Sequence, residues 1–167
     1  MLTFQSVLVP VDFSERSRWA FEMARALASN TRTRLVVLHV IDEVHVAEQA
    51  VLLDESGLLT ELPAAAPAHL QAIEERLREL YPTSATVEVE YRLREGEPAE
   101  EAVRQAKGLG CDLIVVGSHG RTGLDRLLLG SVAEAVLRHA PCPVLVVKSP
   151  AGAAAPAPAN TVAASIA

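Results

Sequence analysis

The amino-acid sequence predicts an α/β fold built on a Rossmann-like parallel sheet, and three observations support this. Short runs of β-branched and aliphatic residues alternate with helical patterns along most of the chain, which is the order of βαβ units. The run at residues 35–40 is almost continuously apolar, as in a parallel strand covered on both faces. With 167 residues, half of them hydrophobic, the chain is long enough to bury one hydrophobic core.

The first βαβ unit is predicted at the start of the chain. Residues 6–11 form an apolar run that ends at Asp12, and residues 35–40 form the second strand. Between them Ser14 is expected to cap a helix, because a serine side chain accepts a hydrogen bond from the free main-chain N–H groups of the first turn. The helical period predicts that four residues of this helix face the core: Ala20, Met23, Ala24 and Leu27.

The middle of the chain is predicted to hold a loop, a helix and an edge strand. Residues 42–67 mix apolar pairs with glycine, proline and acidic residues, which favours a short helix and a mobile loop. A clearer helix follows and stops at Tyr81, directly before Pro82. Residues 86–93 alternate apolar with charged side chains, as in a half-exposed strand near a sheet edge. The apolar face of the helix is expected to be Leu70, Ile73, Leu77 and Leu80.

The last part of the domain repeats the alternation. A helix opens at Glu97 and Pro98 and ends near Gly108 and Gly110, in keeping with the preference for proline at helix starts and glycine at helix ends. Its core-facing residues are expected to be Ala99, Ala102, Val103 and Ala106. A strand, a helix and a strand are then expected at residues 112–116, 131–139 and 143–147.

We expect a single domain at residues 1–148 and a tail at residues 149–167. The tail is rich in alanine and proline and has no charged side chain. It cannot form a core of its own and is expected to be disordered.

The composition argues against two classes of partner. The formal net charge is −6 and the pI is about 5.4, whereas nucleic acid and anionic membranes favour basic surfaces, although a local basic patch is compatible with these values. We therefore expect no nucleic-acid partner and no membrane partner. Residues 1–4 lack the basic region of a signal peptide, and no apolar run approaches the ~20 residues that span a bilayer, so a cytoplasmic protein is expected. Cys111 and Cys142 have no metal-ligand spacing and are expected to be small buried residues rather than nucleophiles.

A group of glycines follows the predicted strand at residues 112–116. Gly117 and Gly120 come directly after this strand, and Gly130 and Ser131 stand at the start of the next helix. In open α/β sheets, ligands bind beyond the carboxyl ends of the strands. Glycines there allow main-chain N–H groups to approach phosphate, and a helix N-terminus favours an anion. The alternative is that these glycines only make turns, but their number in two adjoining turns favours a ligand.

Several weak contributions would have to combine to hold a nucleotide at this position. A helix dipole contributes only about 0.3–1 kcal/mol, whereas a micromolar ligand needs roughly 8 kcal/mol. Main-chain N–H groups, burial of the adenine and Mg²⁺ are therefore expected to act together. Neither the dinucleotide fingerprint nor a Gly-Lys-Ser/Thr phosphate loop is present. Because no lysine lies near the glycines, phosphate charge would be met by the main chain, Arg121, Arg126 or a metal, which favours holding a nucleotide over cleaving it rapidly.

These residues resemble the universal stress protein family. The nucleotide motif of the family, Gly-x2-Gly-x9-Gly-Ser/Thr, reads Gly117-x2-Gly120-x9-Gly130-Ser131 in this sequence. The opening Val-Leu-Val-Pro-Val-Asp-Phe-Ser at residues 7–14 and the ending His-Ala-Pro-Cys-Pro-Val-Leu-Val-Val at residues 139–147 are also similar to the family. The resemblance covers almost the whole chain up to Val147.

The resemblance implies a fold, a ligand and a set of contacts. The fold is a five-stranded parallel sheet in the order 3-2-1-4-5 with helices on both faces, and the ligand is ATP, with Mg²⁺, as in the ATP-binding branch of the family. The adenosine end would be lined by Pro10, Val11 and Asp12, and the adenine edge would meet the main chain of Val40. The ribose and phosphates would be bordered by Val116, Gly117 and Gly120, and the phosphates would also meet Gly130, Ser131 and Val132.

Pairing between two copies of the chain is also expected. The final strand, from Pro143 to Val147, is apolar and would lie at a sheet edge, and an open apolar edge invites pairing with another chain. The resemblance suggests a homodimer through this strand.

Three further side chains have competing interpretations. Asp12 follows a strand, where its carboxylate could accept from ribose hydroxyls or from the adenine amino group, or could cap the following helix. His119 could contact phosphate or assist hydrolysis, or could be a solvent-facing turn residue. His39 lies in a strand pattern and is expected to be a packed or edge histidine.

Three functions therefore remain open. The first is a regulatory module of the stress response that binds ATP, is not an enzyme and acts through a partner. The second is a slow ATP hydrolase that uses His119, Asp12 and Mg²⁺. The third is a partner-binding protein whose glycines only make turns.

Overall fold

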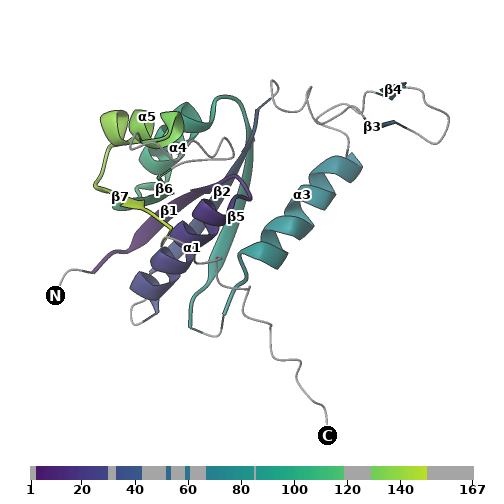
Figure 1. The fold of residues 1–167 in the computed structure, drawn as a ribbon. Coiled ribbons are helices and arrows are strands. Elements are labelled where there is room, and N and C mark those ends of the chain that lie inside the picture. The colour runs from purple at the N-terminus through teal and green to yellow at the C-terminus, as the bar shows by residue number, and fades with distance from the viewer. Residues whose placement is uncertain are drawn as a thin grey trace, which may run out of the picture.

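The centre of the molecule is a parallel β-sheet. The computed structural model describes residues 3–29, 33–42, 67–84, 86–118 and 129–149, together with the short strands at residues 52–53 and 59–60. The sheet has five strands in the order β5-β2-β1-β6-β7 (Figure 1). Counted along the chain within this sheet, the order is 3-2-1-4-5, so the predicted fold is confirmed. The strands are β1 (Ser6–Val11), β2 (Arg34–Ile41), β5 (Val89–Glu95), β6 (Leu113–Gly117) and β7 (Val144–Val147).

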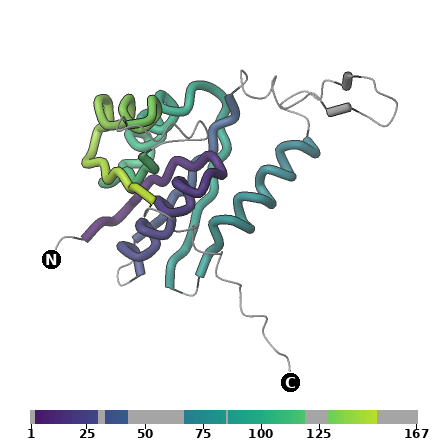
Figure 2. Tube along the Cα trace, in the orientation of Figure 1, coloured from purple at the N-terminus to yellow at the C-terminus, as the bar shows by residue number. Residues whose placement is uncertain are grey.

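Helices cover both faces of the sheet, as the tube view also shows (Figure 2). On one face, a core cluster joins β1 to α1 (Glu15–Ala28) and α3 (Pro67–Leu80). On the other face, a second cluster joins the strands to α4 (Pro98–Leu109) and α5 (Ser131–His139). Successive strand residues point to opposite faces, so Val7 and Val9 belong to the first cluster and Leu8 to the second.

The predicted helix ends are confirmed where the sequence carried a capping residue. Ser14 caps α1, and its hydroxyl accepts from the N–H of Ser17 at 3.2 Å. Glu97 caps α4, with Pro98 in the first turn. Gly110 ends α4 in the left-handed region at a φ of 63°, a conformation that glycine adopts without steric cost.

The predicted inward face of α1 is wrong in part. Met23 and Leu27 are 44% and 39% exposed. The helix is rotated relative to the prediction because Phe21 packs edge-on against Tyr81, with ring centroids 5.3 Å apart. The buried residues of α1 are Ser17, Ala20, Phe21, Ala24 and Ala28.

The middle of the chain is less buried than its apolar pattern suggests. In α3 only Leu77 is fully buried, because this helix covers the edge strand β5. β5 begins at Val89 rather than at residue 86, and its position at the sheet edge confirms the prediction. In the stretch at residues 42–67, the described positions after residue 42 and before α3 are not helical. They are two short antiparallel strands, β3 (Leu52–Leu53) and β4 (Leu59–Thr60).

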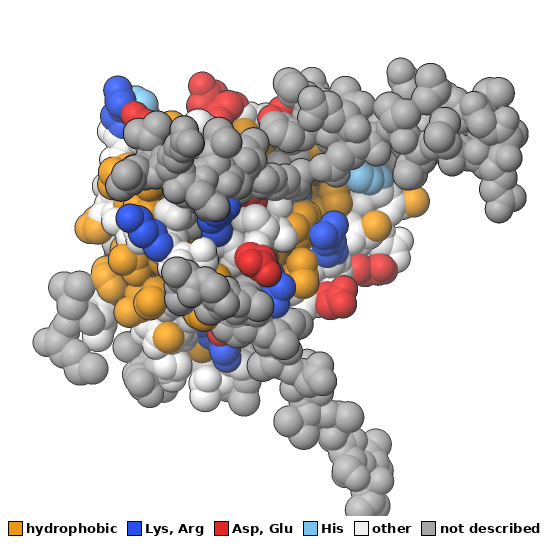
Figure 3. All heavy atoms as spheres, in the orientation of Figure 1, with side chains coloured by type: hydrophobic (Ala, Val, Ile, Leu, Met, Phe, Trp, Pro, Cys, Tyr) orange, Lys and Arg blue, Asp and Glu red, His pale blue; other side chains and the backbone are white. Residues whose placement is uncertain are grey.

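Charged side chains of both signs are interspersed on the face shown in Figure 3. Ion pairs of this kind lie along the helices, for example Arg25 with Glu22 and Arg78 with Glu74. None of the helices described in the structure is both long enough and apolar enough to cross a membrane. The predicted tail lies outside the described residues from residue 150 onward, so the domain boundary stays a prediction.

Candidate functional site

The carboxyl ends of the strands meet along one edge of the sheet, and the pairing there is uneven. β1 and β2 stay paired up to Val11 and His39, and β6 and β7 stay paired up to Gly117 and Val147. Between the described strands β1 and β6, however, the register covers Val7–Leu113 and Leu8–Ile114 alone. The chain leaves β1 toward β2 and leaves β6 toward β7, in opposite directions along the sheet. Such a reversal is where ligands bind in open α/β sheets.

The turn between β1 and α1 lies on one side of the place where β1 and β6 separate. One carboxylate oxygen of Asp12 accepts from the N–H of Ser14 at 3.0 Å, so Asp12 closes a small turn before α1, whereas the cap of α1 itself is Ser14. His39 is buried, as expected of a packed histidine, and its Nδ1 donates to the carbonyl oxygen of Val11 at 2.9 Å. The turn is thereby fixed to the neighbouring strand.

Gly117 has a protein neighbour where a side chain would begin. A Cβ built on Gly117 would lie 3.0 Å from the carbonyl carbon and oxygen of Arg16, in the first turn of α1. A side chain here would therefore require α1 to move away from β6 by a few tenths of an ångström.

The start of α5 lies on the other side of the place where β1 and β6 separate. The N–H of Ser118 donates to the carbonyl oxygen of Val147 at 2.9 Å, and the N–H of Gly130 donates to the carbonyl oxygen of Ser118 at 2.7 Å. The amide of Gly130 is thus engaged within the protein and not directed at a ligand. Gly130 is the N-terminal cap of α5 and contributes no side chain to it. Ser131 is exposed, and the N–H groups of the first helical turn have no partner within a helix.

The predicted contact residues are divided between the two faces of the sheet. One group lies on the face covered by α4 and α5, as the alternation along the strands places Pro10, Val40 and Val116 there. Val132, at the start of α5, packs on the core cluster of the same face. Val11 and Gly117 face α1 instead. His119, Gly120, Arg121 and Arg126 lie outside the described residues, so their predicted roles stay predictions.

Sequence reasoning did not single out the side chains that hold the β1–α1 turn. The ring of Phe13 lies 4.4 Å from that of His39, measured between centroids, and the guanidinium of Arg76 lies 4.6 Å from the Phe13 centroid. The hydroxyl of Tyr81 lies 3.0 Å from Oγ of Ser17. Burial raises the pKa of Tyr81 to about 12, so the hydroxyl stays protonated at neutral pH. These contacts join β2 and α3 to the turn, and no sequence motif predicts them.

The two cysteines are free thiols, Cys111 buried and Cys142 partly buried. Burial raises the pKa of the Cys111 thiol and of the Cys142 thiol, which disfavours the reactive thiolate. Among the described residues, no group of three or more His, Cys, Asp or Glu side chains could hold a metal ion.

Comparison with known proteins gives a consistent result. The model of the Universal stress protein family matches residues 3–148. A putative universal stress protein of Staphylococcus haemolyticus is 34% identical over 154 residues, covering 89% of this chain and 87% of the relative. The solved universal stress protein UspA of Lactobacillus plantarum is 30% identical with a TM-score of 0.65, covering 88% of this chain and 99% of that one.

Two solved structures of the same fold contain an adenine nucleotide. A universal stress protein in complex with cAMP is 24% identical with a TM-score of 0.57, covering 89% of this chain and 100% of that one. A universal stress family protein of Arabidopsis thaliana with AMP bound is 21% identical with a TM-score of 0.55, covering 88% of this chain and 93% of that one. At these identities the likeness to this chain is a likeness of fold.

Proposed function

Because this chain belongs to the universal stress protein family, we propose that it binds an adenine nucleotide, ATP with Mg²⁺, between the ends of β1 and β6. The observation that carries the proposal is the start of α5 at Gly130 and Ser131, at the carboxyl edge of the sheet beside the point where β1 and β6 cease to pair. The spacing Gly117-x2-Gly120-x9-Gly130-Ser131 and the two nucleotide complexes of the same fold support the choice of ligand.

The phosphates are assigned to the first turn of α5. Helix geometry directs its free N–H groups toward the edge, and the positive end of the helix dipole favours an anion. The adenosine is assigned to the side of Pro10 and Val40, which share a face of the sheet with α5. Since the amide of Gly130 is already bonded to Ser118, the amides of residues 131–133 carry the phosphate contacts in this proposal.

The proposed role is regulatory and cytoplasmic. The glycine motif contains no lysine and the sequence has no phosphate-loop motif, which favours a module that holds the nucleotide for a partner to recognise over an efficient hydrolase. A slow hydrolase is the second candidate, because His119 stands within the glycine motif. Turnover assays of the wild type and His119→Ala separate the two, since equal and negligible release of phosphate supports the binding module.

Isothermal titration of ATP with Mg²⁺ into the purified chain tests the binding itself. We expect saturable heat with ATP and a weaker response with inorganic triphosphate, because the adenosine contacts are then lost. Absence of heat at millimolar ATP would leave the partner-binding protein as the remaining function. A mass spectrum of ligand released from protein purified without added nucleotide identifies which adenine nucleotide is preferred.

The homodimer through β7 is part of the proposal. β7 is an edge strand, and Val144, Leu145 and Val146 are only half-buried in the single chain. Pairing of this edge with a second copy would cover these side chains and satisfy the outer main-chain groups of the strand. We expect a dimer in size-exclusion chromatography with light scattering and a monomer for Leu145→Lys. A wild-type monomer, or a dimer that Leu145→Lys leaves intact, rules out this interface.

A further inference from the structure

Phe13 has an unusual main-chain conformation at the edge of the proposed site. Its φ is 64°, and it is the one non-glycine residue with a positive φ in the part of the chain that the structure describes. A side chain in this left-handed region brings its Cβ close to the following carbonyl oxygen, so such residues are rare. They persist only where the surroundings hold them, and they gather at functional sites.

Side chains from two other parts of the fold hold Phe13 in place. Its ring packs against His39 of β2 and against Tyr81, with centroids 4.4 Å and 6.4 Å away. The guanidinium of Arg76, on α3, lies 4.6 Å from the centroid of the same ring. Tyr81 is itself held by α1, because its hydroxyl lies 3.0 Å from Oγ of Ser17.

The conformation of Phe13 controls the geometry of Asp12. The hydrogen bond from the N–H of Ser14 to the Asp12 carboxylate spans Phe13, so the φ of Phe13 decides whether this small turn closes. Val11, on the other side of Asp12, is bonded through its carbonyl oxygen to His39. The same histidine therefore fixes the residue before Asp12 and the ring of the residue after it.

We propose that Phe13 is a positioning residue of the nucleotide site. Its left-handed main chain, secured by His39, Arg76 and Tyr81, holds the Asp12 carboxylate where it accepts a hydrogen bond from the nucleoside. This inference rests on the proposed function. It also makes nucleotide affinity depend on α3, through Arg76.

Two substitutions of Phe13 separate positioning from packing. Phe13→Ala removes the ring and keeps a Cβ, and we expect it to weaken ATP binding about tenfold. Phe13→Gly also removes the ring but adopts a positive φ without steric cost, so it is expected to bind ATP more tightly than Phe13→Ala. If Phe13 served only for packing, Phe13→Gly would bind ATP more weakly than Phe13→Ala, because glycine removes more surface and adds freedom to the unfolded chain.

Coupling to Asp12 gives a second readout. Asp12→Asn keeps an oxygen for the Ser14 N–H and presents an amide in place of the second carboxylate oxygen. In this background the penalty of Phe13→Ala is expected to shrink to less than about twofold, because the two residues act through one contact. Arg76→Ala, which leaves the turn itself intact, is expected to weaken ATP binding about threefold.

Titration calorimetry and thermal unfolding of the full chain are measured together, with Met23→Ala on the exposed side of α1 as the matched control. If the wild type binds ATP but Phe13→Ala binds within twofold of it, or as tightly as Phe13→Gly, the positioning role is overturned and the proposed function stands. If the wild type binds no adenine nucleotide, both fall. If Phe13→Ala does not fold, the comparison of Arg76→Ala with the wild type, alone and with Asp12→Asn, decides the outcome.

Discussion

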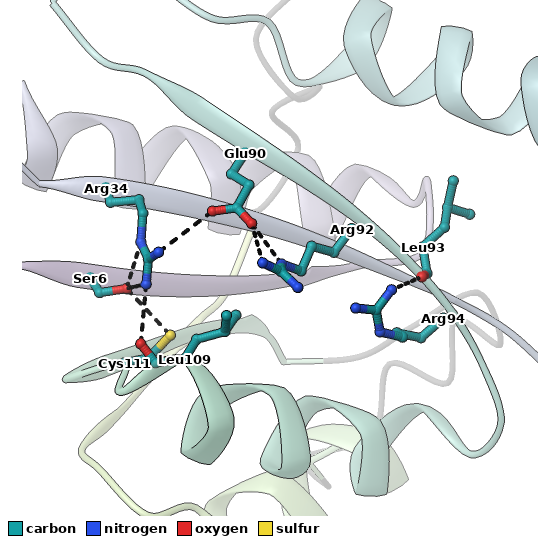
Figure 4. Close-up of polar contacts among 8 residues, drawn as sticks. All are labelled: Ser6, Arg34, Glu90, Arg92, Leu93, Arg94, Leu109 and Cys111. Atoms are coloured by element: carbon teal, nitrogen blue, oxygen red, sulfur yellow. Dashed lines mark hydrogen bonds and ion pairs between the residues drawn. The ribbon is translucent and has the colours of Figure 1, made fainter.

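The two edges of the central sheet are built in different ways. At the edge where the strands begin, side chains add connections to the hydrogen bonds of the main chain (Figure 4). Arg34, at the start of β2, donates to Oγ of Ser6 at 3.0 Å and to the carbonyl oxygen of Leu109 at 3.1 Å. The Asp112 carboxylate accepts from the main-chain N–H groups of Gln5 and Ser6, at 2.7 and 3.2 Å.

At the edge where the strands end, side chains hold the β1–α1 turn, but the connections between β6, β7 and the start of α5 are made by the main chain. Ser118 and Gly130 are joined through main-chain groups, and Gly117 lies against the main chain of Arg16. Of the helices that begin at this edge, α5 starts after a glycine cap, whereas α1 and α4 start at residues whose side chains cap them.

This difference indicates what each edge does. Side chains that bond to the strand starts occupy the polar groups of that edge and hold the sheet together. The main-chain connections between β6 and α5 leave small residues and helical N–H groups near the surface, and an anionic ligand requires such groups. The strand-start edge is therefore expected to determine stability, and the strand-end edge to determine binding.

The largest effect is expected at Gly117, where a substitution is expected to change both the stability of the fold and the affinity for ATP. Gly117→Ala places a methyl group 3.0 Å from the main chain of Arg16, so α1 has to shift. We expect a loss of about 1–3 kcal/mol in the free energy of unfolding and a weaker affinity for ATP. Urea unfolding and titration calorimetry measure the two quantities. The control is Gly108→Ala in α4, where no atom lies within 4 Å of the new methyl group. This variant is expected to lower neither the free energy of unfolding nor the affinity for ATP.

A substitution at the other edge is expected to affect stability alone. Asp112→Ala leaves two main-chain N–H groups without their carboxylate, at a cost of about 2 kcal/mol. Asp112 stands directly before β6, whose length at ~3.3 Å per residue separates it from the carboxyl edge by roughly 13 Å or more. The affinity for ATP is therefore expected to stay unchanged. Asp112→Asn retains one acceptor and should lose about half as much. A large fall in ATP affinity of folded Asp112→Ala would contradict the division between the edges.

The smallest effect is expected at the start of α5, and there it is confined to binding. Ser131→Glu adds a negative charge at the helix N-terminus, which favours the helix by about 0.3–1 kcal/mol. The same charge repels the phosphates, and we expect ATP affinity to fall about tenfold while thermal stability holds or rises. Adenosine, which has no phosphate, serves as the control ligand. Equal losses for ATP and adenosine would place the phosphates elsewhere.

The elements with a local signal were predicted well. Ser14, Glu97, Pro98 and Gly110 define helix ends through their own side chains or main-chain freedom, and each acts as expected. The order of the sheet followed from the resemblance to the family, and its parallel nature from the alternation of strands and helices.

The sequence was least informative where a distant residue decides the outcome. The inward face of α1 depends on Tyr81, which follows α3, and the apolar period of α1 contains no information about that neighbour. The role of Gly117 at the nucleotide stays a prediction, and nothing in the sequence indicated that the atoms nearest to a Cβ built there belong to Arg16. Both facts depend on how α1 rests on the sheet.

The sequence by itself determined the order of strands and helices, the capping residues and the spacing of the glycines, because these depend on neighbours along the chain. Only the tertiary structure decided which side of α1 is buried, why Gly117 is a glycine and how Phe13 is held at a positive φ. The physical reason is that close packing is settled between segments far apart in the sequence, where a difference of a few tenths of an ångström selects one side chain and excludes another.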